Sequence, residues 1–129
     1  MDAGIEKNTK KLRFIRFIKR IRTGKINVAH EQSLLESHDR IILQFPFYWY
    51  STPSLLKQWQ DEVLSYGWAY GEGGDKLHGK ELGLAISTFG PEDSYQPTGY
   101  NHFTMETLTT PLQQTSNLIG TKFFYLCLC

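Results

Sequence analysis

The sequence predicts an α/β domain with a doubly wound parallel sheet, and three observations lead to this fold class. Short, almost wholly apolar runs at 40–45, 82–88 and 122–128 are typical of strands that are buried on both faces of a parallel sheet. Helical patterns at 53–64 and 103–118 stand between these runs, where crossover helices belong. The chain has 129 residues, of which 40% are hydrophobic and 14% aromatic, which is enough for one folded domain.

The N-terminal segment, residues 1–23, is predicted as a separate basic unit that precedes a partial domain over 24–129. Residues 1–25 hold nine Lys or Arg against two acidic residues, a net charge of +7, whereas the rest holds five against eleven, a net charge of −6. The apolar side chains of this segment share one face of a helix: Phe14, Phe17, Ile18 and Ile21. Two interpretations stay open, a helix that packs on the domain and a helix that binds a membrane surface or an anionic partner. Nucleic acid is not expected as a partner, because no stacking or base-reading motif accompanies the charge.

The remaining elements follow from local signals in chain order. Asn27 is expected to cap a short helix that ends at Glu36. Thr52 is expected to cap the next helix, with Pro53 at its first position. Pro111 either starts a second helix within 103–118 or kinks a single one.

Two loops follow the carboxyl ends of predicted strands, which is where ligands bind in sheets of this kind. The loop 46–52 contains four consecutive aromatic residues, and such a loop suits a planar heteroaromatic ligand held by stacking and by backbone N–H groups. The loop 88–102 offers hydroxyl groups, Gly90 for close approach, and Tyr95 and His102 as proton carriers.

Several function classes are excluded. Cys127 and Cys129 are the two cysteines of the chain; they form neither a disulfide framework nor a metal site, so no metal is expected and a reducing, cytoplasmic location is predicted. No run of 18 apolar residues and no secretory signal is present, and no Gly-x-Ser-x-Gly motif indicates a hydrolase.

Three segments make the sequence recognisable: Gln44–Pro53, Tyr66–Gly74 and 88–102. They resemble the flavodoxin-like-fold NAD(P)H:quinone oxidoreductase family, including its modulator-of-drug-activity branch and the ancillary subunits of glutathione-gated potassium-efflux systems. The most specific matches are Phe-Pro-Phe-Tyr-Trp-Tyr at 45–50 and Gly-Tyr-Asn-His at 99–102, and the resemblance covers roughly 24–124.

The resemblance implies a flavin, FAD or FMN, at the carboxyl edge of the sheet, with NAD(P)H as co-substrate, a quinone as acceptor and a homodimer with the site at its interface. The residues implied to bind the flavin are Phe45, Pro46, Phe47, Tyr48, Trp49, Thr88, Gly90 and Tyr95. Tyr95 and His102 are implied as catalytic, with Asn101 as the alternative to His102. Asn101 also belongs to the implied substrate pocket, together with Tyr66, Trp68 and Tyr70, which would line the lip of the pocket in this subunit or its partner.

The sequence departs from the family in three places. The family's first strand, phosphate loop and helix are not recognisable in residues 1–23, and the chain ends inside the last strand. We therefore expect an incomplete flavodoxin-like sheet in which the strand 40–45 has an unpaired edge. Phe89 stands where the family tends to have glycine, and we expect its ring to crowd the flavin.

Three functions stay open on this basis. The first is a flavin-dependent NAD(P)H:quinone oxidoreductase that transfers a hydride through flavin N5. The second is a non-catalytic regulatory subunit of a potassium-efflux system, which associates peripherally with a transporter or with the inner membrane face through its basic segment. The third is an inactive truncated remnant of the family.

Overall fold

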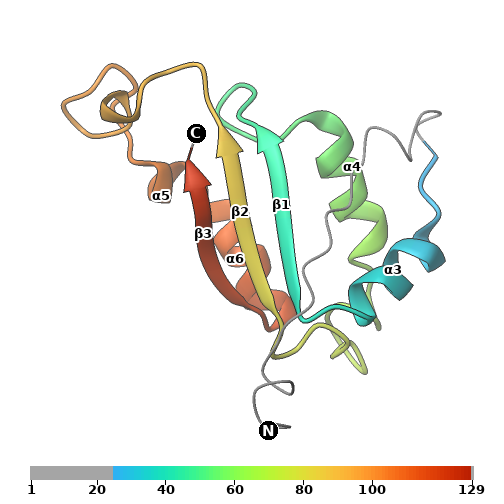
Figure 1. Ribbon diagram of the computed structural model, residues 1–129. Helices are drawn as coiled ribbons and strands as arrows, with labels where there is room; N and C mark the ends of the chain where they lie inside the picture. Colours follow the sequence, from blue (N-terminus) through green and yellow to red (C-terminus); the bar gives the residue numbers. More distant parts are fainter. Residues whose placement is uncertain (1–24, 129) are drawn as a thin grey trace, which may run out of the picture.

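The computed structural model describes residues 25–128, so the predicted N-terminal unit lies outside them. Three strands, β1 (Arg40–Pro46), β2 (Glu81–Ser87) and β3 (Lys122–Leu128), form a parallel sheet in the order β1-β2-β3 (Figure 1). The helices are α3 (Val28–Glu36), α4 (Ser54–Val63), α5 (Met105–Leu108) and α6 (Thr110–Ile119), with a 3-10 turn η1 (Glu92–Ser94). The alternation of strands and helices and the parallel pairing confirm the predicted fold class.

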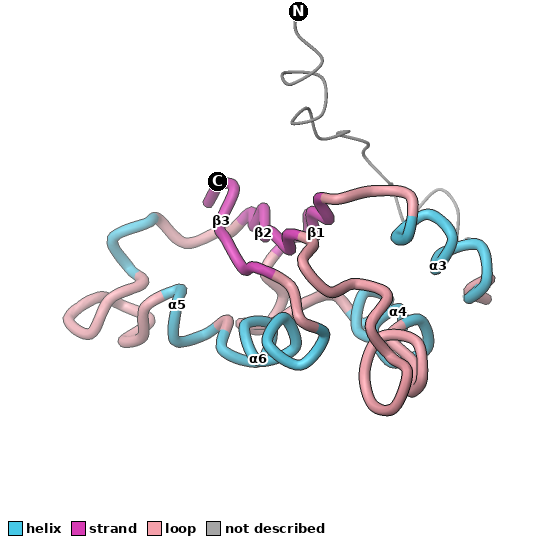
Figure 2. Tube along the Cα trace, turned by 90° about the horizontal axis from the view of Figure 1, so that it is seen from below, coloured by secondary structure: helices cyan, strands magenta, loops and turns pink. Residues whose placement is uncertain are grey.

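The helices α4 and α6 lie on one face of the sheet (Figure 2). Both connections, β1 to β2 and β2 to β3, step in the same direction along the sheet. Parallel crossovers are almost always right-handed, so two crossovers in one direction place their helices on the same face. The helix α3 packs against α4, where the Gln32 side-chain amide donates to the carbonyl oxygen of Val63 at 2.9 Å.

The hydrophobic core lies between this face of the sheet and the two helices. The register aligns Leu43 with Leu84 and Leu84 with Tyr125, so the inward side chains of three strands form one layer. Val63 from α4 and Leu77 from the following loop are fully buried against it. The core is thus built from segments that are far apart in the sequence.

The opposite face of the sheet differs from the prediction for the first strand. Gln44 in β1 is exposed and Ile42 is half-buried, so the expectation that this strand is buried on both faces is wrong. The strand β2 is buried on both faces, because the Phe124 ring covers Gly83, where an added Cβ would lie 2.4 Å from that ring. In the described sheet β1 is an edge strand, as expected.

The ends of the helices confirm two of the three predicted helix signals and contradict the third. The Asn27 side chain accepts a hydrogen bond from the backbone N–H of His30 at 3.1 Å, which confirms the predicted cap. Thr52 does not cap α4; the helix begins at Ser54, and Pro53 is its N-cap residue with an extended backbone and no side-chain bond. Pro111 lies in the first turn of α6, so the segment 103–118 contains two helices, which confirms the first of the two alternatives predicted for this proline.

Candidate functional site

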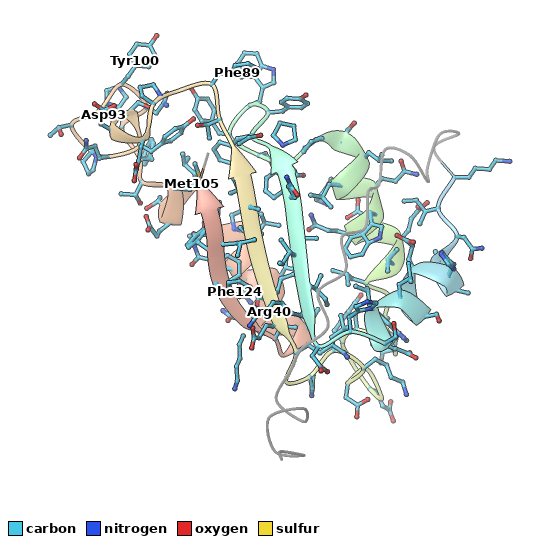
Figure 3. All side chains as sticks on the ribbon, viewed as in Figure 1. Arg40, Phe89, Asp93, Tyr100, Met105 and Phe124 are labelled. Atoms are coloured by element: carbon cyan, nitrogen blue, oxygen red, sulfur yellow. The ribbon has the colours of Figure 1, made fainter. Side chains whose placement is uncertain are left out.

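The loops 47–53 and 88–104 follow β1 and β2 and meet at the carboxyl edge of the sheet, where a groove of about 910 Å³ lies between them. Its aromatic lining is Phe47, Trp49, Tyr50, Phe89, Tyr95 and Tyr100. Figure 3 shows Phe89 above the end of β2, and Asp93 and Tyr100 farther out on the second loop. The predicted location of the ligand site at this edge therefore coincides with an aromatic groove.

The first loop is a closed two-residue turn. The backbone N–H of Tyr48 donates to the carbonyl oxygen of Ser51, and the reverse bond is also formed, both at 3.0 Å. The two residues at the tip, Trp49 and Tyr50, have φ of 48° and 62°, which is the left-handed conformation of a type I′ turn. Glycine and asparagine usually fill such turns, and the conformation costs other residues about 1–2 kcal/mol each.

Positive φ values concentrate at this groove. Within residues 25–128 the non-glycine residues with positive φ are Trp49, Tyr50 and His102, and all three belong to the two loops. Backbone strain of this kind persists where the surrounding structure holds it, and it clusters at ligand sites. The conformation of both loops is consistent with such a site.

The second loop folds back on itself. The Thr88 hydroxyl donates to the carbonyl oxygen of Gly90 at 2.8 Å, and the Ser94 hydroxyl donates to that of Pro91 at 2.6 Å. A Cβ atom on Gly99 would lie 2.5 Å from the carbonyl oxygen of Ser94, so only glycine allows these two segments of the loop to approach so closely.

A cross-loop hydrogen bond joins the two loops. The Tyr50 hydroxyl donates to Asn101 Oδ1 at 3.0 Å, and Asn101 Nδ2 donates to Ser94 Oγ at 3.1 Å. The Phe47 ring contacts Tyr50 and Tyr95 edge-on, with ring centroids 6.3 and 6.2 Å apart. These contacts fix the width of the groove.

Backbone donors remain available on both walls. Among the hydrogen bonds described for residues 25–128, none uses the N–H of Trp49, Tyr50, Phe89 or Gly90. Nor is a bond described there for the Tyr95 hydroxyl, which would lie 3.4 Å from a Cβ atom placed on Gly90. The lining of the groove therefore includes four residues whose backbone N–H groups, and one tyrosine whose hydroxyl, have no acceptor described within residues 25–128.

The groove brings together part of the predicted flavin-binding set. Trp49, Gly90, Tyr95 and Phe47 line it, and Thr88 lines an adjoining hollow of about 820 Å³. The other three do not belong to the described linings: Tyr48 is exposed, Pro46 is the last residue of β1, and Phe45 is buried in the core. The roles of all these residues stay predictions.

Asn101 and His102 are separated by their backbone. Asn101 lines the groove, whereas His102 has φ of 63°, is exposed and does not belong to the described lining. Of the two residues implied as the second proton donor, Asn101 therefore lies in the groove lining and His102 does not, and the role of either residue stays a prediction.

Tyr66, Trp68 and Tyr70 lie away from the groove. They belong to the loop that leads from α4 to the amino end of β2, opposite the carboxyl edge (Figure 1). The Trp68 indole N–H donates to Glu36 Oε1 at 2.8 Å, and the Tyr66 and Tyr70 rings contact each other edge-on. The alternative in which they line a partner's pocket stays a prediction.

Sequence reasoning missed Tyr50 and Ser94 as structural parts of the site. Tyr50 had a signal, because it closes the run of aromatic residues, but Ser94 had none beyond its place in a polar loop. The lining of the groove includes the carboxylate of Asp93, and no Lys or Arg is part of it in the described structure.

In residues 25–128 no three His, Cys, Asp or Glu side chains are grouped to hold a metal ion. No helix in the same range combines the length and the apolar character needed to cross a membrane.

Comparisons with known proteins give the context of this groove. A family model described as flavodoxin-like fold matches residues 6–127. The NAD(P)H oxidoreductase YrkL of Bacillus subtilis, itself uncharacterized, is 57% identical over 98 residues, which are 76% of this chain and 56% of YrkL. The potassium-efflux ancillary protein KefG of Cronobacter sakazakii is 46% identical over 91 residues, which are 70% of this chain and 50% of KefG.

Two solved structures are also similar. General stress protein 14 of Treponema denticola, in complex with FMN, superposes with a TM-score of 0.83 at 39% identity, over 86% of this chain and 64% of that chain. An NADPH-quinone reductase from P. pentosaceus has a TM-score of 0.75 at 38% identity, over 87% of this chain and 71% of that chain.

The chain spans about half the length of the curated relatives it matches. The family match nevertheless extends over nearly the whole chain, and the three parallel strands with their crossover helices agree with it. The chain belongs to the flavodoxin-like fold family.

Proposed function

We propose that this chain carries the ring-binding groove of a flavin-dependent NAD(P)H:quinone oxidoreductase. The observation that supports the proposal is that Trp49, Tyr50, Phe89 and Gly90 line an aromatic groove and that their backbone N–H groups have no acceptor in the described structure. The similarity to the FMN-bound general stress protein 14 and to an NADPH-quinone reductase supports the same reading.

The residues of the groove fit an isoalloxazine ring. Its carbonyl oxygens and unprotonated ring nitrogens accept hydrogen bonds in one plane, and the residues that carry the two pairs of N–H groups belong to the two loops that line the groove. The flavin, when bound, supplies the centre that accepts a hydride from NAD(P)H and passes it to the quinone. The chain's own contribution is to orient the ring and to stabilise charge on it through these fixed dipoles.

Tyr95 is the proposed proton donor of the site. Its ring is held edge-on by Phe47, and its hydroxyl, which has no described partner, faces Gly90. A phenol in that position donates a hydrogen bond or a proton to an oxygen atom bound in the groove. Asn101 is the proposed second donor, with its amide placed by Tyr50 and Ser94.

FMN is the proposed flavin, because the FMN complex of a 39%-identical protein supports it. The described lining of the groove contains no Lys or Arg, so the phosphate group must be bound by other residues. A homodimer is proposed to complete the site, with Tyr66, Trp68 and Tyr70 of one subunit placed at the groove of the other.

The test begins with the visible absorbance of the purified full chain, titrated with FMN and with FAD. We expect a stoichiometric flavin band, preference for FMN, and NADPH oxidation that depends on a quinone. Tyr95→Phe should bind FMN but lower kcat by at least about 10-fold, as expected when a proton donor is lost. His102→Ala is the matched control and should change kcat less than Tyr95→Phe. A folded chain that binds neither flavin would overturn the proposal.

A second candidate, an ancillary subunit of a potassium-efflux system, is favoured by the 46% identity to KefG. The two candidates differ in their response to Tyr95→Phe. A regulatory subunit should still activate potassium efflux from cells that carry the transporter after this substitution, whereas an effect that depends on catalysis should be lost with the reductase activity.

A further inference from the structure

One side-chain amide in the lining of the groove has both of its ends bonded within the chain. Asn101 is half-buried; its Oδ1 accepts a hydrogen bond from the Tyr50 hydroxyl at 3.0 Å, and its Nδ2 donates to Ser94 Oγ at 3.1 Å. An amide side chain can be turned over so that its oxygen and its nitrogen exchange places with little change in shape. The partners of the amide therefore have to decide which end faces which side.

We infer that Ser94 is the positioning residue that decides this orientation, because its own proton is committed elsewhere. Ser94 belongs to the 3-10 turn η1, is 6% exposed, and donates its hydroxyl proton to the carbonyl oxygen of Pro91 at 2.6 Å. The inference rests on the proposed flavin-binding function and adds to it a residue that acts through Asn101.

The direction of the three hydrogen bonds is set at Pro91. A backbone carbonyl oxygen can only accept, and a serine hydroxyl has one proton, so Ser94 Oγ keeps only lone pairs for Asn101. The end of Asn101 that faces Ser94 is therefore the Nδ2 donor, which leaves Oδ1 to accept from the Tyr50 hydroxyl. If the amide were turned over, two acceptor oxygens would face each other and one hydrogen bond would be lost, which disfavours that orientation by about 10-fold or more.

The main chain keeps Ser94 and Asn101 close together. The backbone N–H of Asn101 donates to the carbonyl oxygen of Ser94 at 3.0 Å, so the two residues are joined by their backbones as well as by their side chains. Gly90 lies beside the pair: a Cβ atom on it would be 3.0 Å from Ser94 Oγ and 3.5 Å from Asn101 Nδ2. The Ser94 hydroxyl is therefore enclosed by Pro91, Asn101 and Gly90.

The fixed orientation determines what this part of the groove offers to a ligand. An amide nitrogen carries two protons, and the bond to Ser94 uses one of them, so Asn101 keeps one donor. The Tyr50 hydroxyl donates its proton to Oδ1, so its oxygen keeps only lone pairs. Through Ser94, Asn101 is thus a donor to an oxygen or nitrogen atom bound in the groove, and Tyr50 is an acceptor.

The first test uses the full chain without flavin and follows the side-chain NH2 group of Asn101 by heteronuclear NMR, with Asn101→Ala to identify its signals. Ser94→Ala should speed the hydrogen exchange of this group about 10-fold, because its acceptor is lost. Tyr50→Phe should change the exchange rate less than about 3-fold, because the bond to Ser94 remains. Equal acceleration by the two substitutions, or none in Ser94→Ala, overturns the direction of the bonds.

The second test is a double-mutant cycle on the Kd of FMN. Ser94→Ala and Asn101→Ala should each weaken FMN binding about 5-fold. Because Ser94 acts through Asn101, the double variant should bind FMN as Asn101→Ala does. Independent contributions would instead multiply to about 25-fold and overturn the positioning role.

Two further variants make the cycle specific. Ser87→Ala is the matched control, since this exposed serine ends β2 ahead of the same loop and lies outside the described linings; it should leave the Kd of FMN within about 2-fold of the parent chain. Ser94→Cys keeps the shape of the side chain but bonds weakly, so it should shift exchange and Kd in the same direction as Ser94→Ala, even if the alanine variant does not fold. Parent-like values in a folded Ser94→Cys chain overturn the inference.

The two tests separate failure of this inference from failure of the proposed function. A chain that binds no flavin but shows the expected exchange pattern retains the orientation of Asn101 by Ser94 and loses the flavin-binding function. A chain that binds FMN but shows parent-like exchange in Ser94→Ala loses the role of Ser94 alone.

Discussion

Replacing Trp49 by asparagine should stabilise the protein while it weakens ligand binding. Trp49 has φ of 48° at the tip of the β1 loop, in a turn type that favours Asn followed by a residue with positive φ. The substitution keeps the backbone bonds between Tyr48 and Ser51 and replaces a residue that is strained in this conformation. Native stability and function are therefore expected to change in opposite directions.

The magnitude follows from two opposing terms. A left-handed backbone costs a tryptophan about 1–2 kcal/mol, and asparagine avoids most of that cost. The lost packing is small, because the side chain is 92% exposed, which leaves about 20 Å² of contact and about 0.5 kcal/mol at 25 cal/mol/Å². The free energy of unfolding should rise by about 1 kcal/mol, and Tm by about 4 °C.

The assay is urea denaturation followed by far-UV circular dichroism, with thermal scans in parallel. Phe103→Asn is the matched control: it removes another exposed aromatic ring from a residue whose φ is not positive, and its unfolding free energy should not rise. The reasoning is refuted if Trp49→Asn unfolds at the same or lower urea concentration than the parent chain, or if the control gains as much stability.

Three further predictions concern the loops and the core. Tyr50→Phe removes the hydroxyl that donates to Asn101 and keeps the ring against Phe47. The free energy of unfolding should fall by about 0.5 kcal/mol, and FMN should dissociate several-fold more readily. An unchanged FMN affinity in titrations would contradict the cross-loop bond. Gly99→Ala places a Cβ atom 2.5 Å from the carbonyl oxygen of Ser94. Flavin binding should therefore weaken at least about 10-fold, while the far-UV circular dichroism stays unchanged. Flavin binding equal to that of the parent chain would argue against the close approach of the two residues. Leu84→Ala creates a cavity at a fully buried position, so the free energy of unfolding in urea denaturation should fall by about 3 kcal/mol. A fall of less than about 1 kcal/mol would contradict the described core.

Local signals in the sequence were sufficient for the elements of the fold. The apolar runs that became β1, β2 and β3 were predicted to within about one residue at each end, because hydrophobic patterning depends on burial of the run itself. The Asn27 cap was also predicted, because its hydrogen bond from the N–H of His30 spans only three residues and is therefore a local signal.

The groove was predicted in outline by topology. Ligand sites in parallel sheets lie at the carboxyl edge, and the order of strands and loops in the sequence assigns the loops after β1 and β2 to this edge, where the groove lies. The aromatic character of the first loop could be read directly from residues 47–50.

Only the tertiary structure decided how the side chains of these loops are arranged. Trp-Tyr carries no signal for a left-handed turn, and the turn is tied down by the bond from Tyr50 to Asn101, which lies 51 residues farther along the chain. Neighbours in sequence also separate, because Asn101 lines the groove while His102, with its positive φ, is exposed.

The same limit applies to Tyr66, Trp68 and Tyr70, which were implied for the substrate pocket of this subunit or its partner. Within one chain their loop leads into β2 at its amino end, away from the groove. The sequence by itself determined the strands, the crossover helices and the edge of the sheet at which the groove lies, because these depend on short-range patterns. The tertiary structure decided which side chains line that groove together, because that depends on contacts between residues far apart in the chain.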